Sequence, residues 1–271
     1  MKTAFHIIPV QPPFNAQIQF IWVSTGEKDT TKTKILPNGA IELIINFGKL
    51  QRILDNETLQ IKQTYQNFWV AGLQTKPIII QSVDDTNLVG IRFLPGGAYP
   101  FFKFPVSRIT DMVLEADWMK NELGALRKAI GDLSSLEHIS EVLHSFLAKK
   151  FDGSYPLNES VKYVAAQIIS PEQDIPVADL VKKAGYSHKH FLELFKKQVG
   201  TSPKNLQRII RLQRVIQIAK ENPEARWSDI LLHFPFYDGA HFVHDFKELT
   251  GMTPEKYLSL RTFDENHCLL R

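Results

Sequence analysis

The chain contains a single cysteine, Cys268, among its 271 residues. One cysteine excludes an internal disulfide and a cysteine-based metal cluster, as is usual in a reducing compartment, so we expect a cytoplasmic protein. Cys268 also lacks the basic or helix-start surroundings that lower the pKa of a thiol, and is therefore predicted to be an exposed bystander.

Long apolar runs are missing as well. Residues 1–10 hold one lysine and short apolar pieces broken by His6 and Pro9, which fits neither a signal peptide nor a spanning helix. No membrane partner is therefore expected. Hydrophobic residues make up 44% of the chain and charged residues 23%, as in soluble globular proteins, and its length suggests two domains with separate cores.

Net charge is small, at +3, but basic residues are unevenly distributed. Residues 182–214 contain nine lysines and arginines against one acid, Glu193. A solvated helical face would explain such a run, and a surface that binds nucleic acid would explain it too.

An internal repeat favours the second explanation. Residues 51 positions apart match along two segments, which indicates a duplicated supersecondary unit. The matching pairs are Tyr186/Tyr237, His190/His241, Phe191/Phe242, Phe195/Phe246, Lys196/Lys247, Gly200/Gly251 and Pro203/Pro254.

Each copy predicts a helix, a tight turn and a second helix. Ser187 and Asp238 stand where a side-chain oxygen can cap the second helix, and Gly200 and Gly251 stand where that helix can end. Between the copies, apolar residues recur at three- and four-residue steps from Leu206 to Ala219, which predicts one helix of roughly fifteen residues that ends near Asn222-Pro223.

A helix-turn-helix binds DNA through its second helix, which enters the major groove. Outward residues near the start of that helix meet base edges, whereas basic residues hold phosphates. The predicted base contacts are His188, Lys189, Leu192 and Glu193 in the first copy and Gly239, Ala240, Val243 and His244 in the second. The predicted phosphate contacts are Ser187, Lys196, Lys197, Lys204, Arg208 and Lys247.

These motifs resemble the AraC/XylS family of bacterial transcription regulators. The resemblance rests on residues 179–187, His190-Phe191, Phe195-Lys196-Lys197 and Gly200-Thr201-Ser202-Pro203, and on their second-copy counterparts up to Gly251-Met252-Thr253-Pro254. It implies a seven-helix DNA-binding domain, placed here at residues 157–262, that reads double-stranded DNA, with RNA polymerase as a partner and activation as the expected effect.

The second copy departs from the family. Pro235 stands in the turn where glycine is usual, and proline cannot take the left-handed conformation that glycine permits. Residues 227–258 also hold five acids against two lysines. We therefore expect the first unit to supply most of the affinity and base readout.

Residues 1–152 predict a different domain. Short apolar runs (Phe20–Val23, Ile41–Phe47, Phe68–Ala71, Ile78–Ile80 and Leu88–Phe93) separated by Asn38-Gly39, Gly72, Asp84-Asp85 and Gly96-Gly97 indicate an antiparallel β-barrel or sandwich built from hairpins. Residues 118–130 and 136–151 have helical spacing, so the whole chain is expected to be α+β.

The segments around Asn38-Gly39, Gly72 and Gly96-Gly97 are similar to an N-terminal domain found in a subset of AraC-type regulators. By analogy with the family, this domain is expected to bind an unknown small-molecule effector and to form a homodimer. Glu42 and Arg92 are charges within apolar strands, and either line a ligand pocket or form a structural ion pair.

No catalytic residues, metal site or cofactor are predicted, because no nucleophile, carboxylate pair or phosphate loop has a specific pattern, so we expect no enzyme. Several histidines lie in the repeats, but His190 and His241 occupy equivalent positions that are expected to face inward, which favours packing over metal binding. The alternative function is an N-terminal enzyme or protein-docking module that the C-terminal domain targets to DNA.

Overall fold

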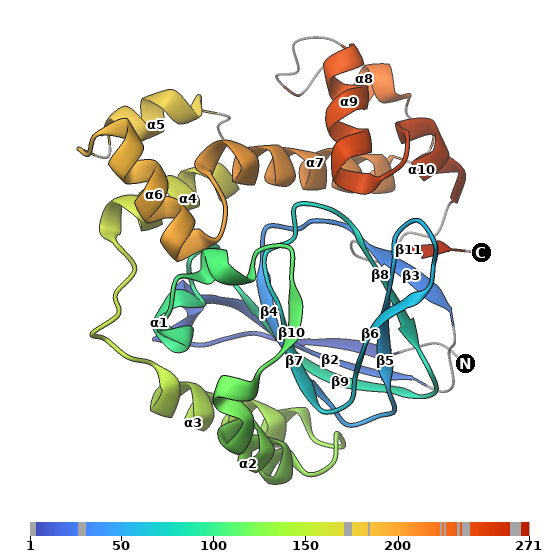
Figure 1. Cartoon of the computed structure of the whole chain (residues 1–271), viewed down its shortest axis with the longest axis vertical. Helices are drawn as coiled ribbons and strands as arrows, with labels where there is room; N and C mark the ends of the chain where they lie inside the picture. The colour runs from blue at the N-terminus through green and yellow to red at the C-terminus, as the bar shows by residue number, and fades with distance from the viewer. Residues whose placement is uncertain are drawn as a thin grey trace.

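The computed structural model of the chain describes residues 4–26, 31–170, 175–183, 185–222, 224, 226–231, 234, 239–260 and 267–270, the last segment by its backbone. It confirms an α+β fold with an N-terminal antiparallel β-region and a helical C-terminal region (Figure 1). Among these residues, no helix is both long enough and apolar enough to cross a membrane.

Two antiparallel sheets face each other in the N-terminal region. The first has the strand order β1 (Ala4–Ile8), β2 (Ile18–Gly26), β9 (Thr86–Phe93), β4 (Ile41–Asn46), β7 (Phe68–Ala71) and β10 (Val113–Glu115). The second has the order β11 (His267–Leu270), β3 (Lys32–Ile35), β8 (Ile78–Ser82), β5 (Gln51–Leu54) and β6 (Ile61–Tyr65).

The alternation of side chains along β4 shows how these layers form. Ile41, Leu43 and Ile45 join the core on the helix side of the first sheet, whereas Ile44 packs between the sheets with Trp22. Successive side chains of a strand point to opposite faces, so the apolar residues at four of the six positions of β4 contribute to the cores on both faces of the sheet.

Helices cover the outer face of the first sheet. They are α1 (Tyr99–Phe102), α2 (Lys120–Ile130) and α3 (Leu136–Lys150), with short 3-10 turns at η1 (Phe14–Ala16), η2 (Val106–Ile109) and η3 (Asp117–Met119). α2 and α3 agree with the helices predicted from the sequence. Leu123, Leu126 and Ile130 recur at three- and four-residue steps on the buried side of α2.

The segments predicted as hairpin turns do not connect neighbouring strands of one sheet. Asn38-Gly39 joins β3 to β4 and Gly72 lies between β7 and β8, so both link strands of different sheets. Asp84-Asp85 does the same between β8 and β9. Gly96-Gly97 forms a turn after β9, with its Gly97 Cα close to the Gln17 backbone. Turn residues mark where a strand stops but do not specify which strand it pairs with.

Seven helices make up the described part of the C-terminal region. They are α4 (Glu159–Ile169), α5 (Val177–Lys183), α6 (His188–Val199), α7 (Pro203–Glu221), α8 (Trp227–Leu231), α9 (Gly239–Thr250) and α10 (Pro254–Leu260). The helix predicted between the repeats is α7, which has 19 residues rather than about fifteen because Ser202 caps it and Pro203 starts it.

The two regions share a hydrophobic core, in contrast to the separate cores expected from the sequence. One cluster of buried residues runs from Ile8 to Tyr257 through both regions. At their contact, the Gln213 amide of α7 donates to the Pro37 carbonyl at 2.5 Å, and the Thr110 hydroxyl donates to the Gly200 carbonyl at 2.6 Å. The division at residues 152–157 remains a prediction about domains.

Candidate nucleic-acid interface

The first helix-turn-helix unit consists of α5 and α6. The Ser187 hydroxyl accepts a hydrogen bond from the His190 amide at 3.4 Å, so Ser187 caps α6 as predicted. Phe191 and Phe195 are fully buried, and Gly200 ends the helix with φ of 103°. The capping, burial and stop signals read from the sequence are therefore confirmed for this unit.

Gln198 is a structural residue of α6 that sequence reasoning missed. Its side chain is buried, accepts from the Asn158 amide at 3.0 Å and donates to the Pro156 carbonyl at 3.2 Å. Asn158 in turn caps α4. Gln198 thus joins the end of α6 to the start of α4, a long-range pairing for which the sequence has no local signal.

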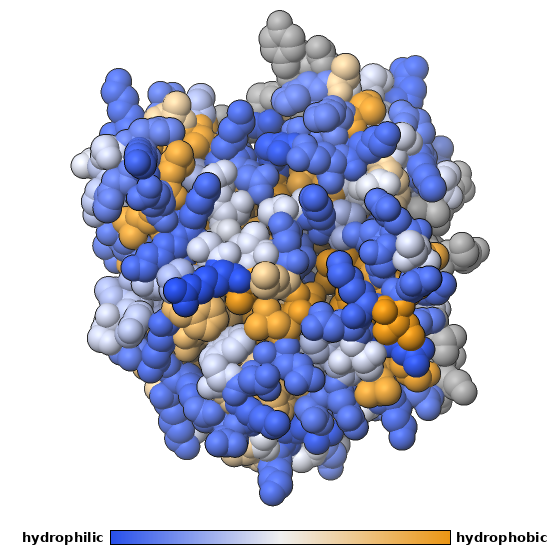
Figure 2. All heavy atoms as spheres, in the orientation of Figure 1, coloured by the Kyte–Doolittle hydropathy of each residue, from blue (hydrophilic) through white to orange (hydrophobic). Residues whose placement is uncertain are grey.

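The outward face of α6 holds the predicted DNA contacts. His188, Lys189 and Glu193 are exposed, and Leu192 is half-buried beside them. Lys196 and Lys197 are exposed one turn further along. On the face seen in Figure 2, the surface over α5 and α6 is mostly hydrophilic, and apolar residues gather below α7 instead.

The second unit consists of α8 and α9. Phe242 and Phe246 are buried against Trp227, with ring centres 5.4 and 5.6 Å from it. The four predicted base contacts of this unit, Gly239, Ala240, Val243 and His244, are all exposed. Pro235 and Asp238 lie outside the described residues, as does His233, so the structure does not describe the proline-containing turn.

Arg208 was predicted to contact phosphate, but it faces protein carboxylates. Its guanidinium lies 2.8 Å from an Asp245 oxygen and 2.5 Å from a Glu248 oxygen, which joins α7 to α9. The hydrogen bond to Asp245 raises the pKa of Arg208 above its ordinary value. Asp245 and Glu248, two of the five acids of the second unit, thus form ion pairs within the domain, and Asp245 is buried.

The lysines and arginines of residues 182–214 differ in their surroundings. All six lysines of residues 182–214, including Lys204, are exposed. Arg214 donates to the carbonyls of Ile168 and Ile169, both at 3.0 Å, and to that of Ser170, so it caps the C-terminal end of α4. The six lysines are therefore open to solvent, whereas Arg208 and Arg214 are engaged within the protein. Lys247 of α9 is exposed as well.

The predicted inward position of the repeat histidines is wrong. His190 is exposed and its ring lies 5.4 Å from that of Tyr186, and the His241 side chain is 44% exposed and lies 3.7 Å from Asp245. The following phenylalanine fills the core in each copy. In the described part of the chain, no group of three potential metal ligands comes together.

Glu42 and Arg92 form the ion pair that the sequence left as an alternative. Their oxygen and nitrogen atoms are 2.8 Å apart, on adjacent strands β4 and β9. The Trp22 indole also donates to Glu42 at 3.2 Å, and the Arg92 guanidinium lies 4.8 Å from the Phe20 ring centre. The charged groups of Glu42 and Arg92 are thus paired within the protein, which supports a structural role for both residues.

Comparison with known families agrees with this geometry. Residues 180–259, from α5 to α10, match a family described as a helix-turn-helix domain. Residues 180–259 form an AraC-type helix-turn-helix domain. This domain contains both repeats. Residues 6–115 match a domain of unknown function, DUF6597. That match does not support the alternative of an N-terminal enzyme or docking module.

The chain is also similar to individual proteins and solved structures. The probable transcription factor PqrA of Proteus vulgaris is 28% identical over 116 residues, which are 42% of this chain and 92% of the relative. A solved structure of ToxT from Vibrio cholerae is 15% identical, with 88% of this chain and 98% of that chain covered and a TM-score of 0.46. The AraC-like activator CuxR is 12% identical, with 86% and 91% covered and a TM-score of 0.25. The protein is a DNA-binding transcription regulator.

Proposed function

We propose that the protein reads duplex DNA with α6 and α9 in the major groove, and that the first unit supplies most of the affinity and base readout. The observation that carries this proposal is the distribution of exposed cations. The first unit and its flanks present six exposed lysines, whereas the described part of residues 227–258, which holds the second unit and its flank, presents two, Lys247 and Lys256. Lys189 can donate to guanine, Glu193 can accept from cytosine, and Leu192 can pack on a thymine methyl.

The test compares matched substitutions in the two units. K189Q and E193Q are each expected to weaken operator binding by about ten-fold and to relax sequence preference, because each removes one hydrogen-bonding group from a base edge. H244A is expected to have a smaller effect. Fluorescence anisotropy with a selected operator measures all three. If H244A abolished binding while K189Q and E193Q kept full affinity, the proposed ranking of the units would be wrong.

Salt dependence tests DNA binding itself. Neutralising about five phosphates gives a slope of log K against log salt of about −4 to −5. A flat slope would contradict an interface built on these lysines.

The regulatory role is a further part of the proposal. We infer from the AraC-type domain that the protein is an effector-responsive activator, acting in the cytoplasm as a homodimer and contacting RNA polymerase. A reporter gene behind the selected operator is expected to gain expression with the intact protein and to lose that gain with K189Q. Repression of the same reporter would contradict the activator role while leaving DNA binding intact.

A further inference from the structure

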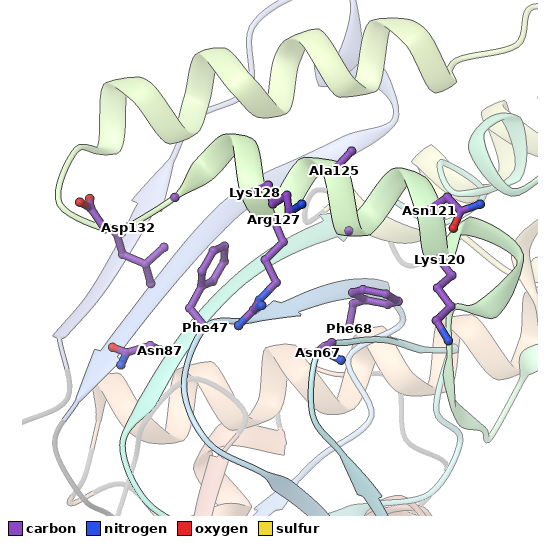
Figure 3. Close-up of a pocket in the computed structure, with 13 residues that line it drawn as sticks. Phe47, Asn67, Phe68, Asn87, Lys120, Asn121, Ala125, Arg127, Lys128 and Asp132 are labelled. Carbon is purple, nitrogen blue, oxygen red and sulfur yellow. The ribbon is translucent and has the colours of Figure 1, made fainter.

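A groove of about 1090 Å³ lies between α2 and the ends of strands β4, β7 and β9. Phe47 and Phe68 rise from the strand ends towards the helix, and Arg127 reaches down from α2 beside them (Figure 3). Figure 1 places α2 on the side of the β-region away from α6 and α9. The groove is therefore separate from the face that binds DNA.

The walls of the groove are cationic. Lys120, Arg127 and Lys128 line it, and Asp132 is the one acid among the lining residues. Asp132 is engaged with Ser134, whose amide donates to it at 3.0 Å. Within the described part of the chain, no carboxylate lies within ion-pair distance of the three cations. Low-dielectric walls around unpaired charges of one sign concentrate a positive potential in a cleft.

Arg127 is held in place before any ligand arrives. Its Nε donates to the Asn46 carbonyl at 2.8 Å, and its guanidinium lies 5.4 Å from the Phe47 ring centre. These contacts use one of the five donors of the guanidinium and restrict its rotamers. A planar cation fixed beside half-buried aromatic rings suits a ligand that combines an anionic group with a ring.

Gly124 leaves space on the helix wall. It lies in the interior of α2, where glycine is less stable than alanine, and a Cβ added there would have no atom within 4 Å. Packing within the protein therefore does not require glycine at this position. The open wall fits a groove whose space is filled by a bound molecule.

We propose that this groove binds a small anionic molecule with an aromatic or apolar body, held by its carboxylate, phosphate or sulfonate group against Arg127, with Lys120 and Lys128 adding to the positive potential of the groove. Phe47 and Phe68 contact the body of the molecule, and the side-chain amides of Asn67 and Asn87 supply hydrogen bonds at the groove's edge. Its volume is slightly above the roughly 300–1,000 Å³ of small-molecule sites and leaves room for such a ligand. This inference does not depend on how the protein reads DNA.

The probe for the test is 8-anilinonaphthalene-1-sulfonate, an anionic aromatic fluorophore, titrated into the whole chain. K120Q/K128Q is expected to weaken its binding by about five-fold or more, since the variant removes two of the three cations that line the groove. G124L fills the groove and is expected to abolish binding. K149Q removes an exposed lysine of α3 that does not line the groove, and G124A adds one methyl; both are expected to bind as the parent does.

Three outcomes would overturn the proposal. Unchanged binding in both K120Q/K128Q and G124L would place the probe elsewhere. Equal affinity for the uncharged N-phenyl-1-naphthylamine would remove the role of charge. Competition by duplex DNA that disappears in K120Q/K128Q would assign the cations to DNA instead. If G124L fails to fold by circular dichroism, K120Q/K128Q against K149Q still decides the question.

Discussion

Arg208 shows that a basic residue within a DNA-binding domain is not automatically a phosphate ligand. Its carboxylate partners lie 37 and 40 residues away in the chain, and its side chain is 22% exposed. The residue fixes α9 against α7, and so sets where the second recognition helix stands relative to the first. Its effect on DNA binding is therefore expected to be indirect.

Arg208→Gln tests this role. We expect a loss of about 2 kcal/mol in the free energy of unfolding, because Asp245 is left buried without its cation, and an unchanged salt slope for DNA binding. Lys196→Gln is the matched control, expected to keep the stability and to reduce the slope by about one. Urea unfolding and salt titrations measure both. A reduced slope in Arg208→Gln would restore Arg208 as a phosphate ligand.

Tyr65 allows a pH-dependent test of the β-region. Its hydroxyl donates to the Val113 carbonyl at 2.5 Å, and burial, with the Glu115 charge, raises the pKa of Tyr65 to about 12. A raised pKa in the folded state means that the neutral phenol is favoured there. The contribution of the Tyr65 hydroxyl to stability is complete below pH 10, the ordinary pKa of tyrosine. That contribution is lost as the pH rises towards about 12.

Tyr65→Phe is therefore expected to lower stability by about 1 kcal/mol below pH 10, with the difference from the parent shrinking at higher pH. Parallel urea unfolding of the two proteins measures the gap. A gap that widened with pH would contradict the assignment.

At the scale of the element, α6 combines a structural cap with the surface that we propose to face DNA. Ser187 was predicted as a phosphate contact, and the structure shows that its hydroxyl also caps the helix. Two substitutions separate these roles. Ser187→Ala is expected to cost about 1 kcal/mol of stability because it removes the cap, whereas Ser187→Asp retains the cap and places a negative charge beside the phosphates.

Ser187→Asp is accordingly expected to keep the melting temperature of the parent and to bind operator DNA several-fold more weakly. Differential scanning calorimetry and anisotropy give the two readouts. Normal DNA affinity in Ser187→Asp would show that no phosphate lies near the hydroxyl.

How far the elements could be predicted depended on where their signals lie. The caps and ends of α6 and α7 are local, and Ser187, Gly200 and Ser202 revealed them in the sequence. Strands β3, β5 and β6 were missed because polar residues make up half or more of each, so that none holds a long apolar run, and β6 is exposed at four of its five positions. Sheet pairing and the partners of Arg208 depend on residues far apart in the chain, which a local pattern does not record.

At the scale of the whole molecule, α7 packs against the loop before β4. A Cβ added at Gly39 would lie 3.1 Å from Leu206 Cδ1 and 3.2 Å from Ile210 Cδ1, and the φ of Gly39 is 77°. Gly39 is therefore required by both its backbone and its neighbours. The contact makes the position of α7 sensitive to changes in the N-terminal region.

Gly39→Val is expected to lower stability by about 2–3 kcal/mol through backbone strain and overpacking. Hydrogen exchange in α7 is expected to rise with it. Gly153→Val is the control, since a Cβ at Gly153 would meet no atom within 4 Å. Equal stability of the two variants would show that the loop and α7 are not tightly packed in solution.

The chain returns to its first region at its end, where β11 pairs with β3 through residues 267–270. The helical region is thus attached to the β-region both before α4 and after α10. A region attached at two points is more restricted in its movement than a region attached at one. When the packing around α7 loosens, the second attachment therefore limits how far α9 can be displaced, and a wider displacement requires the backbone hydrogen bonds between β11 and β3 to break first.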